Sequence, residues 1–303
     1  MTSPAANLCG RGVWFYPDGL TGNETIEFAQ RLESLGYSAL WLPDAGGRDV
    51  FALAARLLDH TERLVLASGV ANVYARDPLA MRSAQLTLAE QSGGRFLLGI
   101  GISHQPLVED MRGHVYGKPV TTMRGYLDAM KAADAGYVGP RPEAEPPTVL
   151  AALGPKMLEL ARDAADGAHP YMVTPEHTMQ ARAILGPDRL LCTEQKVVLE
   201  SDPESALAIA RETAAIAMGL QLPNYQNNLI RLGFGPADFE GGPSDRVIEA
   251  VVAMGDADAI EPRLRAHHEA GASHVCIHPI HPDGLSVPWW PAIEALAPAA
   301  NAQ

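Results

Sequence analysis

Short apolar runs alternate with longer amphipathic segments along almost the whole chain. The runs are rich in Val, Ile, Leu and aromatic residues, which is typical of buried strands. Between the runs, apolar residues recur at helical spacing; the first such segment is predicted to begin with Asn23 as its cap and to end at Gly36. The pattern predicts eight strands, at residues 12–16, 38–43, 63–70, 95–100, 148–152, 168–171, 190–199 and 273–278.

Eight strands that alternate with helices favour an α/β fold of the (β/α)8 or TIM-barrel type, which typically needs about 250 residues. The alternative is a doubly wound parallel sheet, which usually carries a Gly-x-Gly-x-x-Gly turn after its first strand. No such turn follows Tyr16. We therefore expect a single barrel domain over residues 1–303. Residues 219–255 are expected to form a loop or helical insertion before the eighth strand, with residues 233–243 as a loop or lid.

Composition narrows the possible partners of this fold. Hydrophobic residues make up 47% of the 303 residues, enough for a sizeable core, and the formal net charge is -13. This charge argues against nucleic acid or an anionic membrane as the main partner, because both attract basic surfaces. No apolar run approaches the roughly 18–20 residues of a membrane-spanning helix, and residues 1–11 lack a signal-peptide pattern. Three isolated cysteines suit a reducing compartment, so a cytoplasmic location is expected.

Functional side chains of a parallel barrel gather at the carboxyl ends of its strands and in the loops that follow. The polar residues at these predicted ends are Asp44, residues 68–72, 103–105 and 154–156, His169, Tyr171, His278 and His281. A catalytic metal in such a barrel would call for a His-x-His pair on strand one, which instead offers Trp14, Phe15 and Tyr16. We therefore expect no metal site.

Three of these strand ends could contact a cofactor, and each also has a purely structural explanation. Gly154 and Pro155 open a helix whose free N–H groups and dipole can hold a phosphate, with Lys156 nearby, but they also suit an ordinary turn. The glycines of residues 99–101 could admit a flat ligand or a tight bend of the strand. Asp44 could accept hydrogen bonds from a cofactor ring or cap the turn that follows it.

Together these stretches resemble the luciferase-like monooxygenase superfamily, and most closely its actinobacterial branch of coenzyme F420-dependent oxidoreductases. The resemblance runs from about Gly12 to Pro298 and rests on the order and spacing of several stretches. They include LGYSALWLPD at 35–44 and SGGRFLLGIG at 92–101. The others are residues 66–78, 154–158 with 165–168, 225–229 with 232–234, and 270–272.

The resemblance implies a barrel that holds the deazaflavin coenzyme F420 at its C-terminal mouth. In this family a bulge at the end of strand three, often with a non-prolyl cis peptide, lies behind the ring; it corresponds here to Ser68, Gly69 and Val70. Asp44 corresponds to a residue that contacts the ring or its hydroxyl, and the adjoining loop corresponds to Ile102 and Ser103.

The phosphate-binding turn of the family corresponds here to Ala152, Leu153, Gly154 and Pro155. This is the same turn that the helix-dipole argument selects as an anion site. FMN shares the tricyclic ring and the phosphate, so it is the alternative cofactor.

The implied chemistry is hydride transfer between the deazaflavin C5 and a small organic substrate, with the protein supplying orientation and a proton donor or acceptor. In the sugar-phosphate dehydrogenases of this family a histidine follows the aspartate and an acid follows strand four. This sequence has Ala45 and His104 there, which disfavours a sugar phosphate as substrate. His104 becomes the candidate catalytic residue, because imidazole exchanges protons near neutral pH. Tyr16, Tyr225 and His278 are expected to line the substrate side.

Two alternatives to an F420-dependent oxidoreductase stay open at this point. One is an FMN-dependent luciferase-like monooxygenase, and the other is a barrel that binds a cofactor or ligand without turnover. A small-molecule substrate is the expected partner, and the resemblance adds a second copy of the chain in a homodimer.

Overall fold

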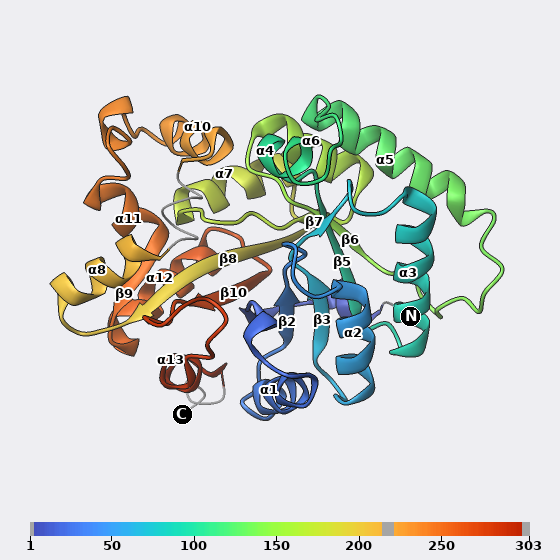
Figure 1. The fold of residues 1–303 in the computed structure, drawn as a ribbon, viewed down its shortest axis with the longest axis horizontal. Coiled ribbons are helices and arrows are strands. Elements are labelled where there is room, and N and C mark those ends of the chain that lie inside the picture. Colours follow the sequence, from blue (N-terminus) through green and yellow to red (C-terminus); the bar gives the residue numbers. More distant parts are fainter. Residues whose placement is uncertain (1–2, 214–220, 299–303) are drawn as a thin grey trace.

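A computed structural model describes residues 3–213 and 221–298, and within them eight parallel strands form a closed barrel (Figure 1). Neighbouring strands pair in parallel, and β10 pairs with both β1 and β8, which closes the ring. The predicted TIM barrel is therefore confirmed. Its strands are β1 (Gly10–Trp14), β2 (Ala39–Leu42), β3 (Val65–Ser68), β5 (Phe96–Gly101), β6 (Thr148–Leu150), β7 (Gly167–Ala168), β8 (Leu190–Leu199) and β10 (His274–Pro279).

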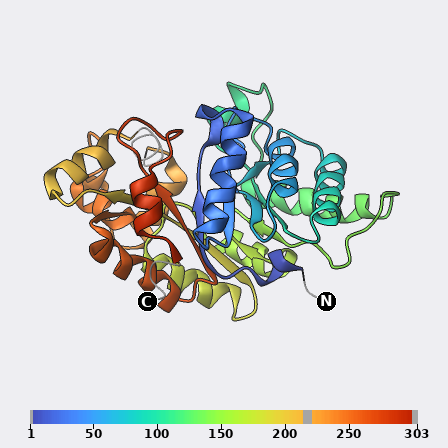
Figure 2. The same cartoon turned by 90° about the horizontal axis from the view of Figure 1, so that it is seen from below.

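Helices surround the barrel, and the first and second halves of the chain lie on opposite sides of it (Figure 2). Proline stands in the first turn of many of these helices, because its fixed φ suits that position. The helices are α1 (Gly22–Ser34), α2 (Val50–Asp59), α3 (Pro78–Gln91), α4 (Gln105–Glu109), α5 (Pro119–Asp134), α6 (Pro155–Ala164), α7 (Pro175–Leu185), α8 (Pro203–Glu212), α10 (Pro223–Arg231), α11 (Asp245–Val251), α12 (Ala257–Glu269) and α13 (Trp290–Ala295). Short 3-10 turns are η1 (Pro4–Asn7), η2 (Pro17–Gly19) and η3 (Pro236–Asp238).

Side chains alternate between the two faces of each barrel strand, as the pleat requires. Leu40 and Leu66 belong to the large core that the strands share with the helices. Their neighbours Trp41 and Ala67 belong to a separate cluster, together with Cys192 of β8 and Cys276 of β10. This second cluster fills the interior of the barrel, so the barrel is a packed core at this level.

A bulge follows β3 and shapes the adjacent strand. The Gly69–Val70 peptide is cis, as the resemblance implied for this position, and the chain then re-pairs with β5 as β4 (Ala71–Asn72). A Cβ on Gly99 would lie 2.1 Å from the carbonyl oxygen of Ser68, and one on Gly101 would lie 2.7 Å from Val70. The two glycines of β5 therefore make room for the bulge.

The connection between β8 and β10 is long and contains α8, α10, α11, α12 and a further strand, β9 (Val252–Gly255). β9 pairs with Lys196–Leu199 at the C-terminal end of β8 and is not one of the eight strands that close the ring. Within the predicted insertion at 219–255, the structure shows α10, η3, α11 and β9, and the strand was not predicted. Residues 219 and 220 lie outside the described residues.

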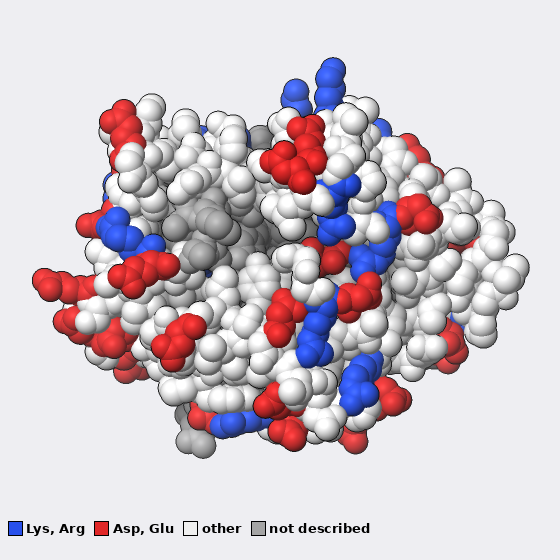
Figure 3. All heavy atoms as spheres, in the orientation of Figure 1, with Lys and Arg blue, Asp and Glu red and all other residues white. Residues whose placement is uncertain are grey.

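No helix in the described part of the chain combines the length and the apolar character needed to span a bilayer. On the face shown in Figure 3, Lys and Arg side chains are interspersed with Asp and Glu, and no broad basic patch covers that face. This distribution agrees with a formal net charge of -13.

Candidate functional site

Asp44 follows β2 and is held by a cation and a backbone amide. Its Oδ2 accepts a hydrogen bond from Arg76 at 2.6 Å and from the N–H of Asn72 at 3.1 Å. Arg76 also pairs with Asp49, the cap of α2. Asp44 is therefore a fixed, ion-paired carboxylate, and its pairing with Arg76, 32 positions farther along the chain, joins the ends of β2 and β4.

The bulge at residues 68–70 rests on an indole inside the barrel. Trp14 donates a hydrogen bond from Nε1 to the carbonyl oxygen of Gly69 at 3.0 Å. The hydroxyl of Ser68 donates to the carbonyl of Gly99 at 2.8 Å and accepts from its N–H at 2.9 Å. The Ser68 hydroxyl is thus used within the barrel wall, and the bulge itself is held from both sides.

The loop after β5 brings the predicted residues Ile102, Ser103 and His104 to the barrel mouth. Ser103 has φ 56°, and its carbonyl accepts a hydrogen bond from the hydroxyl of Tyr116 at 3.3 Å. His104 precedes α4, and its ring centre lies 5.8 Å from that of Tyr225 on α10. Burial lowers the pKa of His104 below its usual value. Helix α10 therefore extends over the ends of the barrel strands and meets the predicted proton-transfer residue there.

The turn before α6 presents the positive end of a ten-residue helix. Gly154 is its N-cap and provides no side-chain cap, while Ala152 and Leu153 precede it. A Cβ on Gly154 would lie 3.8 Å from the guanidinium of Arg231 on α10. A helix N-terminus and a guanidinium therefore face the same space, which suits an anion.

The side chains around the turn before α6 differ in burial and in the hydrogen bonds that they already make. Lys156, which the sequence placed near the anion, has an exposed side chain. Nε2 of His177 lies 2.9 Å from the carbonyl oxygen of Leu153, and its Nδ1 is buried without a partner among the described residues. Neither Arg231 nor His177 could be selected from the sequence pattern, since they come from the later helices α10 and α7.

The residues predicted to line the substrate side gather around Trp14. The Trp14 ring lies 4.4 Å from the ring of His278, 4.8 Å from Tyr16 and 5.3 Å from Tyr171. Tyr171 in turn lies 6.3 Å from Tyr225. Burial raises the pKa of Tyr16 to about 12, so its phenol stays protonated at neutral pH. The structure thus brings Tyr16, Tyr225 and His278 into one aromatic group.

A cluster of ionisable side chains lies beside this aromatic group, inside the barrel. Glu194 Oε1 accepts hydrogen bonds from Lys196 Nζ at 2.7 Å and from His278 Nδ1 at 3.0 Å. Its Oε2 accepts from the N–H of Met172 at 2.9 Å. The side chains of Glu194, Lys196 and His278 are fully buried, and the Lys196 ammonium lies 3.6 Å from the centre of the Tyr171 ring.

The environment sets the charges in this cluster. Burial alone would raise the pKa of Glu194, but Lys196 and the hydrogen bond from His278 lower it to about 2. Burial lowers the pKa of Lys196, which Glu194 opposes, and lowers the pKa of His278 to about 4. At neutral pH the cluster therefore holds a carboxylate, an ammonium and a neutral imidazole.

The sequence carried a signal for this cluster that the strand assignment did not use. Strand β8 is apolar at both ends, yet Glu194 and Lys196 occupy its middle, two residues apart. Residues at this spacing share one face of a strand, and Cys192 on the same face belongs to the barrel interior. Two opposite charges on the inward face of a buried strand indicate a buried pair.

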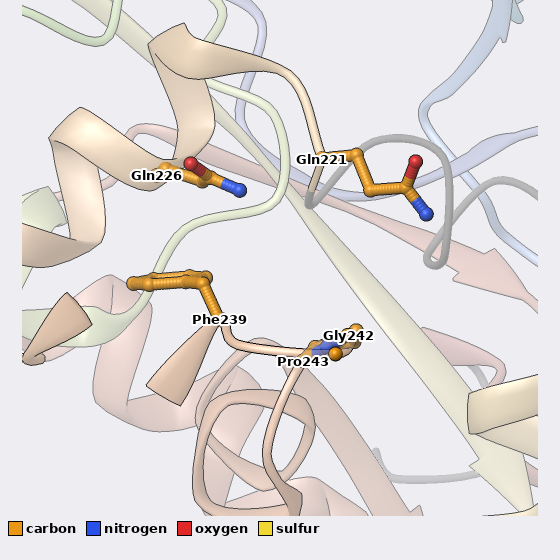
Figure 4. A pocket seen from close by; sticks show the side chains of 6 residues that line it. Gln221, Gln226, Phe239, Gly242 and Pro243 are labelled. Atoms are coloured by element: carbon orange, nitrogen blue, oxygen red, sulfur yellow. The ribbon is translucent and has the colours of Figure 1, made fainter. Parts of the chain in front are cut away.

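Two cavities lie outside this group of residues. One, of about 310 Å³, is lined by Gln221, Gln226, Phe239, Gly241, Gly242 and Pro243, with Gln226 and Phe239 on one side and Gln221 on the other (Figure 4). The other, of about 430 Å³, follows β9 and α12. Neither is lined by a residue predicted for the site. Within residues 3–213 and 221–298, no group of three or more His, Cys, Asp or Glu side chains could hold a metal ion.

The fold and these contacts define a TIM barrel with a helix N-terminus close to a guanidinium, a bulge supported by Trp14, and a buried ionisable cluster. The chain belongs to the luciferase-like monooxygenase family, whose model matches residues 10–274. The resemblance inferred from the sequence is thereby confirmed.

Several known proteins are similar to this chain. A Mycobacterium tuberculosis protein provisionally named a coenzyme F420-dependent oxidoreductase is 25% identical over 309 residues, covering 83% of this chain and 89% of that protein. An F420-dependent secondary alcohol dehydrogenase, solved with an F420-acetone adduct, shares the fold with a TM-score of 0.72 at 14% identity, covering 98% of each chain. The FMN complex of the oxygenating constituent of 3,6-diketocamphane monooxygenase from Pseudomonas putida has a TM-score of 0.70 at 14% identity, covering 96% of this chain and 98% of that one.

Proposed function

We propose that the protein is an F420-dependent oxidoreductase that transfers a hydride between the deazaflavin and a small organic substrate. Its family and its F420-linked relative support the cofactor class. The observation that carries the proposal is the turn at Gly154, where a helix N-terminus and Arg231 face one space. The bulge at residues 68–70 follows β3, two strands away round the barrel, so a ring and a phosphate tail can be held at one end of it.

The residues present fit a tricyclic cofactor with a phosphate. Ala152, Leu153, Gly154 and Pro155 would hold the phosphate, and Arg231 would neutralise part of its charge. Ser68, Gly69 and Val70, supported by Trp14, would lie behind the ring, with Ile102 and Ser103 beside it. When bound, the deazaflavin supplies a ring carbon that accepts or releases a hydride.

Asp44 and His104 would form polar contacts with the bound cofactor or exchange protons beside it. Asp44, fixed by Arg76, would accept a hydrogen bond from the ring or its hydroxyl. His104 would exchange a proton at the mouth, because burial lowers its pKa and keeps a neutral imidazole available near pH 7. Tyr16, Tyr225 and His278 would line the space for the substrate.

The alternative function keeps the barrel and changes the cofactor. The similarity of this fold to an FMN-containing monooxygenase favours an FMN-dependent oxygenase as the second candidate. A deazaflavin has carbon at the position where reduced flavin forms an oxygen adduct, so the two functions differ in their reaction with air.

Titration of the purified protein with F420, and separately with FMN, tests the proposal. We expect a saturable change in F420 fluorescence and absorbance, with affinity at least about tenfold higher than for FMN, a difference of about 1.4 kcal/mol. Tighter FMN binding, with oxygen insertion when the reduced flavin meets air, would establish the alternative. Failure to bind either cofactor would contradict both functions.

A further inference from the structure

One nitrogen of the His278 ring is engaged and the other is free. Nδ1 lies 3.0 Å from Oε1 of Glu194, and a carboxylate only accepts hydrogen bonds, so Nδ1 carries the ring proton. Nε2 is then left with its lone pair. This atom is buried, and it has no hydrogen-bond partner in the part of the chain that the structure describes. A buried acceptor without a partner in the protein points to a ligand that donates a hydrogen bond.

Glu194 holds the imidazole in this orientation. Lys196 and the N–H of Met172 also donate to this carboxylate, at 2.7 Å and 2.9 Å. The carboxylate therefore cannot turn away without losing two other hydrogen bonds. A carboxylate behind one ring nitrogen fixes the tautomer and stabilises the imidazolium that forms when the other nitrogen accepts a proton.

The other buried histidines lack this arrangement. His267 and His274 each have both ring nitrogens close to polar atoms of the protein. His169 and His177 each have one unpartnered nitrogen, but the other lies against a backbone carbonyl. Among the described buried histidines, His278 alone combines a carboxylate at one nitrogen with a free lone pair at the other.

The surroundings of His278 select an uncharged ligand with an apolar body. The rings of Trp14, Tyr16 and Tyr171 lie within 4.4 to 6.3 Å of the imidazole ring. The nearby cation, Lys196, is already paired with Glu194 and lies over the Tyr171 ring. An anionic substrate would compete with Glu194 for that ammonium, whereas a hydroxyl group needs only the lone pair.

We propose that His278 is a catalytic residue that accepts the hydroxyl proton of an uncharged alcohol, that Glu194 positions it, and that the alcohol is the substrate of the oxidoreductase; this rests on the proposed F420-dependent function. In the oxidation, the O–H bond and the adjacent C–H bond break and a C=O bond forms. The proton goes to Nε2, and the hydride goes to the oxidised deazaflavin, which is reduced. The imidazolium releases its proton to water, and reduction of the carbonyl compound follows the reverse path.

His104 lies farther out and differs in its contacts. It contacts the ring of Tyr225, which in turn contacts Tyr171, so two tyrosine rings stand between the two histidines. The proposal therefore assigns the substrate hydroxyl to His278 and leaves proton exchange at the mouth to His104.

Two substitutions at His278 separate binding from proton transfer. His278→Asn retains an N–H toward Glu194 and removes the acceptor at the Nε2 position, whereas His278→Gln leaves a non-basic amide near that position. With oxidised F420 and alcohols from 2-propanol to cyclohexanol, we expect kcat to fall about 10²- to 10⁴-fold in both variants. KM should rise in His278→Asn and stay near the wild-type value in His278→Gln. His281→Gln, three residues farther along on the following loop, is the matched control and should leave both constants unchanged.

A second measurement needs neither cofactor nor turnover. Histidine-labelled protein examined by ¹⁵N NMR should show His278 with a protonated Nδ1 and an unprotonated Nε2 between about pH 5.5 and 8, since the pKa is lowered to about 4. Added 2-propanol should shift the Nε2 resonance. Glu194→Gln alone leaves Lys196 buried without its partner, so the double variant with Lys196→Met is the folded test of positioning; its Nε2 shift should be lost.

The outcomes distinguish this proposal from the proposed function. F420 binding, measured by fluorescence for each variant, should match the wild type. Wild-type kcat in His278→Asn together with loss of turnover in His104→Ala would overturn the proposal, and so would a proton on Nε2. If the wild type binds no F420, the proposed function fails, and the NMR result still decides whether His278 binds the alcohol.

Discussion

Gly69 lies against the indole of Trp14, and this contact leaves no room for a side chain. A Cβ at this position would lie 2.6 Å from Nε1, the atom that donates to the Gly69 carbonyl. We expect Gly69→Ala to destabilise the fold by about 1–3 kcal/mol, because overpacking displaces a buried ring. It should also weaken F420 binding, because the bulge is proposed to support the ring. Urea unfolding and fluorescence titration measure the two effects.

Gly125 provides the matched control for this substitution. It lies within α5, and a Cβ there would meet nothing within 4 Å. Gly125→Ala should therefore stabilise the protein by about 0.5–1 kcal/mol, as expected for an exposed helical position. Equal effects of the two substitutions would show that the Trp14 contact does not restrict position 69.

Helix caps have their partners close by in the sequence, so the sequence limits each cap to a few candidate residues. Asp77, directly before a proline, caps α3, with its side chain accepting from the N–H of Ala80 at 3.0 Å. The predicted cap at Asn23 is wrong: α1 begins at Gly22, and Thr21 caps it in a reciprocal capping box with Glu24. Both residue types suit a cap, and the pairing with Glu24 decides between them.

Residues whose partners are distant in sequence were harder to assign. Asp44 and Arg76 pair across 32 positions, and Glu194 meets His278 across 84. The pattern placed β2, β8 and β10 close to their observed bounds but did not predict β4, which precedes Arg76. Which side chains meet inside the ring depends on the register of the barrel strands, which the pattern does not give. The roles proposed for the predicted site residues remain predictions, while their positions at the strand ends follow from the fold.

At the scale of elements, the N-terminus of α6 is the feature most open to test. Gly154→Asp would place a carboxylate near Arg231 at the position proposed for the phosphate. We expect affinity for F420 to fall about tenfold or more, because a buried or partly buried like charge opposes the phosphate. Folding stability should rise slightly, because Asp is a better N-cap than Gly and favours the helix dipole.

Gly154→Asp should lower F420 affinity and raise folding stability, so a general loss of structure cannot explain the expected result. Thermal unfolding reports the cap, and fluorescence titration reports the cofactor. Lys156→Gln, at an exposed position two residues farther along, is the control and should change F420 affinity little. Unchanged affinity in Gly154→Asp would place the phosphate elsewhere.

The elements that sequence predicted well are those with clear boundaries. Strand β8 was predicted with its observed bounds, and a proline or glycine marks the ends of most helices. Strand β9 was missed because α11 ends at Val251 and β9 begins at Val252, with no turn residue between them. It pairs with Lys196–Leu199 of β8, on the edge of β8 that β10 does not occupy, so the eight-strand count gave no place for it.

At the scale of the whole molecule, buried histidines make the fold sensitive to mild acid. Burial lowers the pKa of His169 and His278 to about 4, and that of His267 and His274 to about 3. In the unfolded chain these groups return to about 6.5, so below that pH the unfolded state binds more protons. Stability is therefore retained above about pH 6.5 and should fall between pH 6.5 and 4, at about 1.4 kcal/mol per pH unit per group, which for four groups amounts to roughly 10 kcal/mol in total.

Urea midpoints measured by tryptophan fluorescence at pH 7.5, 6.5 and 5.5 test this dependence. The pKa of Glu194 is lowered to about 2, so its protonation affects stability only below about pH 4.5. Between pH 7.5 and 5.5 the change in stability is therefore dominated by protonation of the histidines. A flat profile from pH 7.5 to 5.5 would contradict the assignment of these histidines as neutral and buried.

The pairing of β1 with β10 has a consequence for biosynthesis. Gly10 of β1 lies opposite His274 of β10. One edge of β1 pairs with β2, but its other edge stays uncovered until β10 has been made. A nascent chain that ends before residue 274 already contains the other seven barrel strands, but the barrel between β8 and β1 is still open. Exposed strand edges are templates for pairing with other chains. Completion of the ring thus depends on long-range contacts, which slow folding, and the edge of β1 stays exposed until residues 274–279 have been made and have paired with it.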